Sequence, residues 1–271
     1  MIRLILLAGG LGNQLFQMAA AEKIFGNSNY TVFTGKLNNY STKRKPISLK
    51  LLGSQHSILE PNPIMRLILS SKIIGVLVNS PIKIILKFCF DIKIISGYFQ
   101  DCAKYLRGIH VIVKKIELEN ERKLKILKSK YNINSNDVGI HIRLGDYLTE
   151  DKFWVIDNDY IRNTLSKFTN IPRLIVFCEE KVPEYFLKEL VNFSGEIVFS
   201  FDLDLDDLEE FLLMSTLQNL VISNSTFSFW ASLVGNNNSK MVFAPKKYFK
   251  STKNEQWIKN CQIMNIECVE C

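Results

Sequence analysis

Side chains that could bind an anion follow an apolar stretch near the middle of the chain. Residues 138–142 read Val-Gly-Ile-His-Ile, and Arg143, Gly145 and Asp146 come next. Alternation along a strand places His141 and Arg143 on one face, and the glycine allows the backbone to turn. Arg143 offers a charged, bidentate donor suited to phosphate, and His141 can donate or accept a hydrogen bond. The segment is equally compatible with a surface ion pair between Arg143 and Asp146 beside a half-buried histidine.

A glycine-rich turn follows the first apolar run of the chain. Residues 9–17 read Gly-Gly-Leu-Gly-Asn-Gln-Leu-Phe-Gln and lead into a helical pattern. Glycines let a ligand approach the backbone closely, and free N–H groups at a helix start favour negative charge. The spacing matches neither the dinucleotide fingerprint nor the kinase P-loop. Asn13 and Gln14 can bind sugar hydroxyls or phosphate oxygens, and capping of the helix by Asn13 is the alternative.

A third polar segment stands at the end of another apolar stretch. Residues 222–230 read Ile-Ser-Asn-Ser-Thr-Phe-Ser-Phe-Trp. Ser225 or Thr226 at a helix N-terminus would bind a diphosphate through hydroxyl and backbone N–H groups together. The alternative is an ordinary Ser or Thr N-cap followed by core aromatic residues. All three segments share one placement, at the carboxyl end of an expected strand, where ligands of α/β proteins collect.

The elements that must position these residues alternate along the chain. A strand at 2–8 and a helix at 12–25 come first, and from residue 136 the pattern predicts strands to Arg143 and at 173–178, 196–200 and 219–223, with helices at 158–169, 183–191, 206–215 and 226–234. Such alternation predicts parallel sheets with crossover helices. We therefore expect two α/β lobes with a cleft between them. The polar residues around 130–136 suggest lobes at 1–133 and 134–271, the second ending in a C-terminal tail.

Composition limits the classes of partner. The chain has 271 residues, 47% hydrophobic content and a net charge of +7, which suit a globular protein with an anionic partner. The basic residues form no nucleic-acid-binding signature, so nucleic acid is not expected as a partner. The six cysteines lack metal-site spacing and are expected to be reduced thiols of a cytosolic protein. The apolar run at the start leads into glycines and a helix, so it reads as a strand and not as a signal peptide.

The segment 64–95 mixes long apolar side chains with lysines. Its uninterrupted apolar runs are too short to cross a bilayer. A basic amphipathic segment of this kind can lie on an anionic membrane surface, or it can pack on its own lobe. Packing on its own lobe is the commoner outcome for such a segment.

Five segments, in order along the chain, resemble the α-1,2-fucosyltransferases of glycosyltransferase family 11. They are residues 9–17 (GGLGNQLFQ), 96–100 (SGYFQ), 141–147 (HIRLGDY), 211–215 (FLLMS) and 222–230 (ISNSTFSFW). The resemblance implies a GT-B-like pair of Rossmann-type lobes. It also implies inverting transfer of L-fucose from GDP-L-fucose, without a metal or other cofactor, to the 2-hydroxyl of a terminal galactose-type sugar.

The resemblance carries residue roles with it. Arg143 matches the arginine that holds the donor diphosphate, and His141 matches the histidine near the nucleotide. The implied donor-binding set comprises Gly10, Gly12, Asn13, His141, Arg143, Glu210, Asn224, Ser225 and Thr226. The candidate catalytic residues are Arg143, which would stabilise negative charge on the departing phosphate, and Asp146, the nearest carboxylate to serve as a base. The alternative for Asp146 is to orient the arginine, which is the commoner role of an aspartate beside an arginine.

The same resemblance suggests partners and a location. The acceptor would be an oligosaccharide or a lipid-linked glycan in bacterial surface-glycan synthesis of the O-antigen type. The protein would then act in the cytoplasm, peripherally at the inner face of the cytoplasmic membrane, where it could contact anionic lipid.

Three positions depart from the family pattern. The family usually has two adjacent arginines, and the second is Leu144 here. The aspartate that would read N1 and N2 of guanine is Glu210, which is longer by one methylene. The usual Ser-Asp-Asp after the central strand is replaced by Cys178, Glu179 and Glu180. The diphosphate would therefore depend on a single arginine in this motif.

Two other functions fit parts of the sequence. Asp202-Leu203-Asp204 has the D-x-D pattern with which GT-A glycosyltransferases hold Mn²⁺ or Mg²⁺ against a nucleotide diphosphate. The same acidic residues are typical of the approach to a helix N-terminus, here the one expected at 206. A basic peripheral membrane protein without catalysis, built on 64–95, is the other alternative. It leaves the polar strand-end motifs unexplained.

Overall fold

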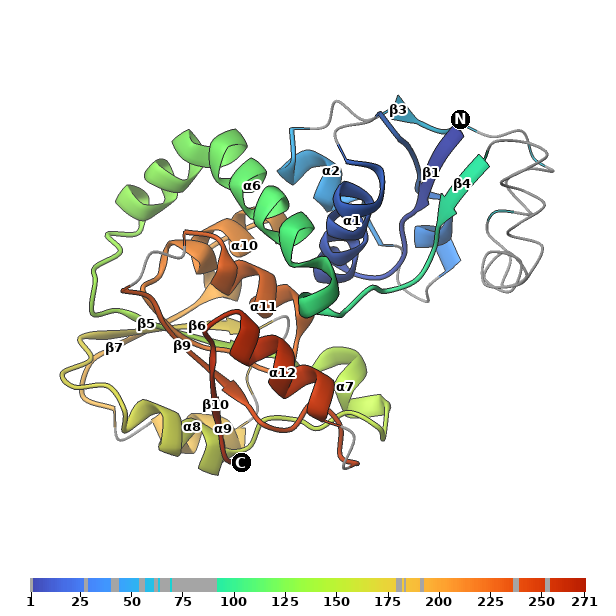
Figure 1. Ribbon diagram of the computed structural model, residues 1–271. Helices are drawn as coiled ribbons and strands as arrows, with labels where there is room; N and C mark the ends of the chain where they lie inside the picture. The colour runs from blue at the N-terminus through green and yellow to red at the C-terminus, as the bar shows by residue number, and fades with distance from the viewer. Residues whose placement is uncertain are drawn as a thin grey trace. The chain divides into compact units, whose positions relative to one another are not determined.

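The computed structural model describes residues 2–26, 29–39, 44–53, 57–60, 63, 69, 92–178, 182, 184–190, 193–235, 239–251 and 254–271. The chain forms two compact units, Met1–Glu119 and Asn120–Cys271. Each unit holds one parallel sheet (Figure 1). The α/β class and the two Rossmann-type lobes are therefore confirmed. The division falls inside a long helix, α6 (Cys102–Lys130), and not in the polar segment that follows it.

The first unit is built on a four-stranded sheet of order β3-β2-β1-β4. Its strands are β1 (Ile2–Leu6), β2 (Thr31–Phe33), β3 (Ser57–Ile58) and β4 (Ile92–Ile95). Between them lie α1 (Leu11–Phe25), the 3₁₀ helix η1 (Gly35–Asn39) and α2 (Ile47–Leu51). β1 pairs with β2 on one side and β4 on the other. The carboxyl ends of β1 and β4 therefore meet at the topological switch point of this sheet.

The start of α6 packs against α1 at very close range. A Cβ atom added at Gly108 would lie 1.9 Å from the backbone oxygen of Ala19. Only glycine allows the two backbones to approach in this way. Ala19, Ala20 and Ala21 of α1 are fully buried, so small side chains on both helices permit the contact.

The second unit holds six parallel strands in the order β10-β9-β8-β5-β6-β7. They are β5 (Val138–Ile142), β6 (Arg173–Cys178), β7 (Glu196–Phe199), β8 (Asn219–Val221), β9 (Met241–Pro245) and β10 (Glu267–Val269). Read from β7 across to β10, this is the strand order of a dinucleotide-binding Rossmann sheet. The chain runs outward in both directions from β5 and β8. The switch point of the second unit therefore lies between these two strands.

Helices cover both faces of the second sheet. They are α7 (Gly145–Thr149), α8 (Asn158–Leu165), α9 (Glu184–Leu190), the 3₁₀ helix η2 (Ser200–Asp202), α10 (Asp207–Thr216), α11 (Thr226–Leu233) and α12 (Glu255–Ile263). Figure 1 shows α8 and α9 on one face and α10 and α11 on the other. All five residues of β5 are buried, as expected for a central parallel strand with both faces covered.

Several elements differ from the expectation. The strand predicted to run through Arg143 ends at Ile142, and the helix predicted at 158–169 ends at Leu165 because the chain turns to pack Phe168 on Phe243. The predicted C-terminal tail instead forms β9, α12 and β10, and completes the sheet. The long helix α6 was not expected.

Membrane-related features fall largely outside the described residues. Of the segment 64–95, only residues 69 and 92–95 are described, so its packing against the first unit or a membrane stays a prediction. Across the described ranges, no helix combines the length and the apolar character needed to cross a membrane.

Candidate functional site

Histidine and serine side chains meet at the switch point of the second unit. His141 is the fourth residue of β5, and Ser223 stands just beyond β8. The Nδ1 atom of His141 lies 2.7 Å from the Oγ atom of Ser223. The imidazole also stacks on the ring of Phe227, with centroids 5.7 Å apart. Two of the three polar segments found in the sequence are therefore joined at one edge of the sheet.

The electrostatics of His141 favour the neutral imidazole. Burial lowers its pKa to about 3, and the nearby charge of Arg143 acts in the same direction. A neutral imidazole has one N–H donor and one acceptor nitrogen. His141 can therefore orient a ligand by hydrogen bonding, and it does not supply a positive charge near neutral pH.

The permanent positive charge at this edge comes from Arg143, the first residue after Ile142. Its guanidinium carbon lies 5.6 Å from the centroid of the Tyr147 ring, which is cation–π distance. Tyr147 is itself held, because its hydroxyl donates to the backbone oxygen of Asn224 at 2.9 Å and its ring stacks on Phe153 at 4.3 Å. The arginine thus rests on a fixed aromatic support.

Residues at the start of α11 combine both roles that the sequence allowed. Ser225 is the N-cap, and its hydroxyl accepts from the backbone N–H of Phe227 at 3.3 Å. Thr226 begins the helix. A helix N-terminus next to an arginine is a favourable place for phosphate oxygens. The cap and a phosphate contact are compatible, because the remaining N–H groups of the first turn stay available to a ligand.

Asn224 has a structural task at the same edge. Its amide nitrogen donates to the backbone oxygens of Trp154 and Tyr248, at 2.8 and 2.7 Å. Both amide protons are therefore used to hold loops of the unit together. Asn224 lies at the predicted place, but donation of its N–H groups to a donor nucleotide would need those contacts to break.

A buried carboxylate stands at the neighbouring strand ends. Glu210, in the first turn of α10, accepts a hydrogen bond from the hydroxyl of Ser200 at 2.6 Å. Ser200 follows β7, and its oxygen accepts from the backbone N–H of Cys178, the last residue of β6, at 3.3 Å. Burial raises the pKa of Glu210. The predicted guanine-reading carboxylate thus lies at the same carboxyl edge of the sheet as His141, beyond β6.

Three predicted positions have side chains outside the described residues, and a fourth has a packing role. The side chain of Asp146 lies outside the described residues, as do Glu179 and Glu180. Leu144, where the family has a second arginine, is 2% exposed and belongs to the hydrophobic core. The apolar side chain at this position therefore serves packing.

The acidic run before α10 serves the helix. Asp202 ends η2 and Asp204 has a positive φ of 49°. Asp206 is the N-cap of a complete capping box with Glu209. Across the described ranges, no three His, Cys, Asp or Glu side chains gather in a way that could hold a metal ion.

The glycine turn of the first unit lies at its own switch point. Gly10 is the N-cap of α1 and has no side-chain capping bond, so Asn13 is not the cap. A Cβ atom at Gly10 would meet no atom within 4 Å. Gly12 is the second residue of α1. Asn13 instead accepts a hydrogen bond from Gln100, beyond β4, at 2.7 Å.

Two glutamines of α1 hold this turn in place. Gln14 is fully buried and bonds to the backbone oxygens of Gly9 and Lys45, at 3.1 and 2.9 Å, and to the hydroxyl of Ser48. Its predicted contact with sugar or phosphate is therefore replaced by a structural role. Gln17 donates to the backbone oxygen of Gly97 at 2.9 Å.

Residues that sequence reasoning missed share one signal. Ser200 follows β7 directly, and Lys36 stands three residues after β2, with its ammonium 3.2 Å from the Ser96 hydroxyl. Burial lowers the pKa of Lys36. Their contacts come from the tertiary fold, so only the strand-end position was available as a clue.

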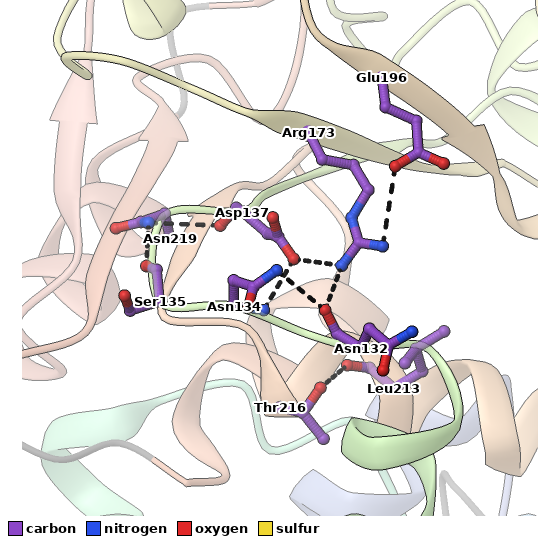
Figure 2. Close-up of polar contacts among 9 residues, drawn as sticks. All are labelled: Asn132, Asn134, Ser135, Asp137, Arg173, Glu196, Leu213, Thr216 and Asn219. Carbon is purple, nitrogen blue, oxygen red and sulfur yellow. Dashed lines mark hydrogen bonds and ion pairs between the residues drawn. The ribbon is translucent and has the colours of Figure 1, made fainter.

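Another polar cluster occupies the opposite, amino edge of the second sheet (Figure 2). Arg173, which begins β6, forms an ion pair with Asp137 just before β5 and donates to the backbone oxygen of Asn132 at 2.7 Å. Asn219, which begins β8, donates to the backbone oxygen of Ser135 at 2.8 Å. Ligands of such sheets bind at the carboxyl edge, so we assign this cluster to stability.

Comparison with known proteins agrees with the geometry. Residues 86–264 match the family described as Glycosyl transferase family 11. Two relatives from Escherichia coli are the O-antigen biosynthesis glycosyltransferase WbnK, 25% identical over 90% of this chain and 93% of the relative, and an alpha-1,2-colitosyltransferase, 24% identical over 90% and 91%.

Among solved structures, a glycosyl transferase of family 9 from Veillonella parvula aligns with a TM-score of 0.46 and 9% identity, over 99% of this chain and 85% of that one. The family 11 match covers well over half of the sequence. The protein therefore belongs to glycosyl transferase family 11.

Proposed function

We propose that the protein transfers L-fucose from GDP-L-fucose to the 2-hydroxyl of a terminal galactose-type sugar, with inversion and without a metal. The observation that carries the proposal is the convergence of His141, Arg143 and Ser225 at the β5/β8 switch point. These residues supply a cation, a neutral hydrogen-bonding ring and a helix N-terminus. Together they suit a nucleoside diphosphate.

The mechanism follows from where charge develops. Departure of GDP places negative charge on the β-phosphate, and Arg143 with the N–H groups of α11 would stabilise it. Support from Tyr147 limits the reorganisation that the arginine needs during the reaction. Asp146 remains our proposed base for the acceptor hydroxyl, because it is the carboxylate of the motif. Gly10, Gly12 and Asn13 remain proposed donor-binding residues of the first unit.

The names of the relatives support a proposal for the acceptor and a second candidate for the sugar. One relative is named for O-antigen biosynthesis, so we propose a bacterial surface glycan as the acceptor, free or lipid-linked, at the inner face of the cytoplasmic membrane. The other relative is named as a colitosyltransferase. Transfer of colitose is therefore the second candidate, and a parallel assay with a colitose donor separates the two.

The test is calorimetric titration with GDP, GMP, UDP and ADP, with and without EDTA. We expect GDP to bind best, EDTA to have no effect, and Arg143→Ala to weaken GDP binding about 10- to 100-fold, which is the worth of a charge-assisted hydrogen bond. The matched control is Arg162→Ala, which removes an exposed arginine of α8 paired with Asp159 and should leave GDP binding unchanged. Metal-dependent binding of UDP would instead favour the D-x-D enzyme, and binding of no nucleotide would refute the proposal.

A further inference from the structure

Ser200 connects three elements at the carboxyl edge of the second sheet. It follows β7 directly and is 3% exposed. Its hydroxyl oxygen accepts from the N–H of Cys178 at the end of β6, and its proton lies toward Glu210 of α10, 2.6 Å away. One small side chain therefore links a strand, a 3₁₀ helix and the helix that carries the carboxylate.

The direction of these hydrogen bonds is fixed by chemistry. A backbone N–H can only donate, so the bond from Cys178 occupies a lone pair of the serine oxygen. The single hydroxyl proton is then left for the Glu210 oxygen Oε1. A short hydrogen bond donated by a hydroxyl favours the ionised form of the carboxylate that accepts it. Within the described part of the chain, no other hydrogen bond to the Glu210 carboxylate is found, which leaves accepting capacity on its Oε2 atom.

The electrostatic surroundings make this bond important. Burial raises the pKa of Glu210, the hydrogen bond from Ser200 lowers it, and the charge of Asp207 on the same helix raises it. A lysine of α6, Lys123, lies nearby but pairs with Glu209 at 3.2 Å. Among the described residues, the interaction that favours the ionised form of Glu210 is thus the one from Ser200.

We propose that Ser200 is a positioning residue for recognition of the nucleotide base, because it holds the Glu210 carboxylate in one orientation and keeps it ionised. An ionised carboxylate accepts hydrogen bonds from two adjacent N–H donors, which is the pattern that guanine presents at N1 and its 2-amino group. This inference rests on the proposed GDP donor. Ser200 itself need not touch the nucleotide.

The test compares GDP with inosine diphosphate, which lacks the 2-amino group, by calorimetry from pH 5.5 to 8.5. The wild type should prefer GDP about tenfold, in line with one hydrogen bond to a charged group. Ser200→Ala should reduce GDP affinity about tenfold and bind inosine diphosphate with a smaller loss. Ser232→Ala is the matched control, because it removes a buried hydroxyl that donates to the backbone oxygen of Phe229.

A pH profile separates positioning from general loss of structure. Without the serine proton, the pKa of Glu210 rises further, so GDP affinity should begin to fall at a higher pH in Ser200→Ala than in the wild type. The control Ser232→Ala should keep the wild-type profile. If Ser200→Ala does not fold, Ser200→Cys keeps a similar volume with a much weaker donor and should show the same shift.

A double-mutant cycle identifies the route of the effect. If Ser200 acts through the carboxylate, Ser200→Ala should have no further effect on GDP affinity in a Glu210→Gln background. Equal losses in both backgrounds would overturn the inference. The inference would also be overturned if Ser200→Ala kept the wild-type preference for GDP over inosine diphosphate and the wild-type pH profile. The proposal that GDP is bound would stand in that case. If the wild type shows no preference for GDP and Glu210→Gln is neutral, base reading by Glu210 fails, and this inference fails with it.

Discussion

At the scale of single residues, the buried imidazole of His141 links folding to pH. Its pKa is about 3 in the folded protein, because of burial first and Arg143 second, and an unfolded histidine has a pKa near 6.5. Between these two pKa values, the histidine is protonated in the unfolded state and neutral in the folded state. Stability from the neutral ring is complete above about pH 6.5 and is lost as pH falls from there toward 3.

We expect the free energy of unfolding of the wild type to fall by about 1.4 kcal/mol per pH unit between pH 6 and 5 from this residue alone. His141→Gln can still hydrogen-bond to Ser223 but cannot titrate, so its loss of stability over this range should be smaller by that amount. Urea unfolding at pH 7, 6 and 5 measures the difference. His110→Gln removes an exposed histidine and should behave as the wild type; equal slopes for all three proteins would contradict the argument.

Residue types predicted the site better than they predicted the task of each side chain. Arg143 and Ser225 lie where the strand-end pattern placed them. Gln14 and Asn224 also lie at the predicted edges, yet their amides bond to backbone oxygens far away in sequence. An amide suits a sugar hydroxyl and a backbone carbonyl equally well, so sequence alone could not tell which one it binds.

At the scale of elements, the cluster in Figure 2 fastens the starts of β5, β6 and β8. Asp137 is fully buried, and its carboxylate pairs with Arg173 and accepts from the N–H of Asn134 at 2.8 Å. The side chain of Arg173 is 14% exposed. Removal of Arg173 leaves the buried negative charge of Asp137 without its cationic partner. Removal of the negative charge from Asp137 instead leaves the Arg173 cation, which can still reach water.

We therefore expect Arg173→Ala to lower the free energy of unfolding by about 3 kcal/mol or more, and Asp137→Asn by less. Urea unfolding at pH 7 measures both. GDP affinity of the folded variants should be unchanged, because the cluster lies at the edge opposite His141. Arg162→Ala breaks an exposed pair and should cost about 0.5 kcal/mol or less. A loss for Arg173→Ala no larger than this control would show that the pair adds nothing.

The periodic parts of the sequence predicted elements well, and the others did not. From β5 to α11, apolar runs alternate with amphipathic segments. Each predicted element is present, β6 with the predicted bounds and the others with one or both ends shifted. The helix α6 carries charged residues along much of its length, and its close contact with α1 depends on Gly108, a residue that by itself disfavours a helix. Strands β9 and β10 join the sheet through long-range pairing, which local pattern does not reveal.

At the scale of the whole molecule, charge is divided unequally between the two units. Residues 1–119 contain 16 Lys and Arg against six Asp and Glu, a net of +10, and residues 120–271 contain 18 against 21, a net of −3. The overall charge of +7 thus comes from the first unit alone. An anionic surface would attract this unit through its lysines and arginines.

We expect the whole protein to bind vesicles with anionic headgroups in low salt and to be released at 0.5 M NaCl, since screening weakens such attraction. Replacement of Lys72, Lys83 and Lys87 by glutamine should weaken vesicle binding at least about tenfold, because each lysine near the surface contributes about 1 kcal/mol. Co-sedimentation measures binding.

The control replaces Lys188, Lys250 and Lys259, which are exposed residues of the second unit, and changes the net charge by the same amount. It should bind vesicles as the wild type does, because attraction falls off within a Debye length and depends on which lysines approach the lipid. Equal losses in both triple variants would mean that net charge alone governs adsorption. Unchanged binding in both would exclude an electrostatic contact through Lys72, Lys83 and Lys87. GDP affinity should stay constant throughout, since none of the six lysines belongs to the proposed donor site.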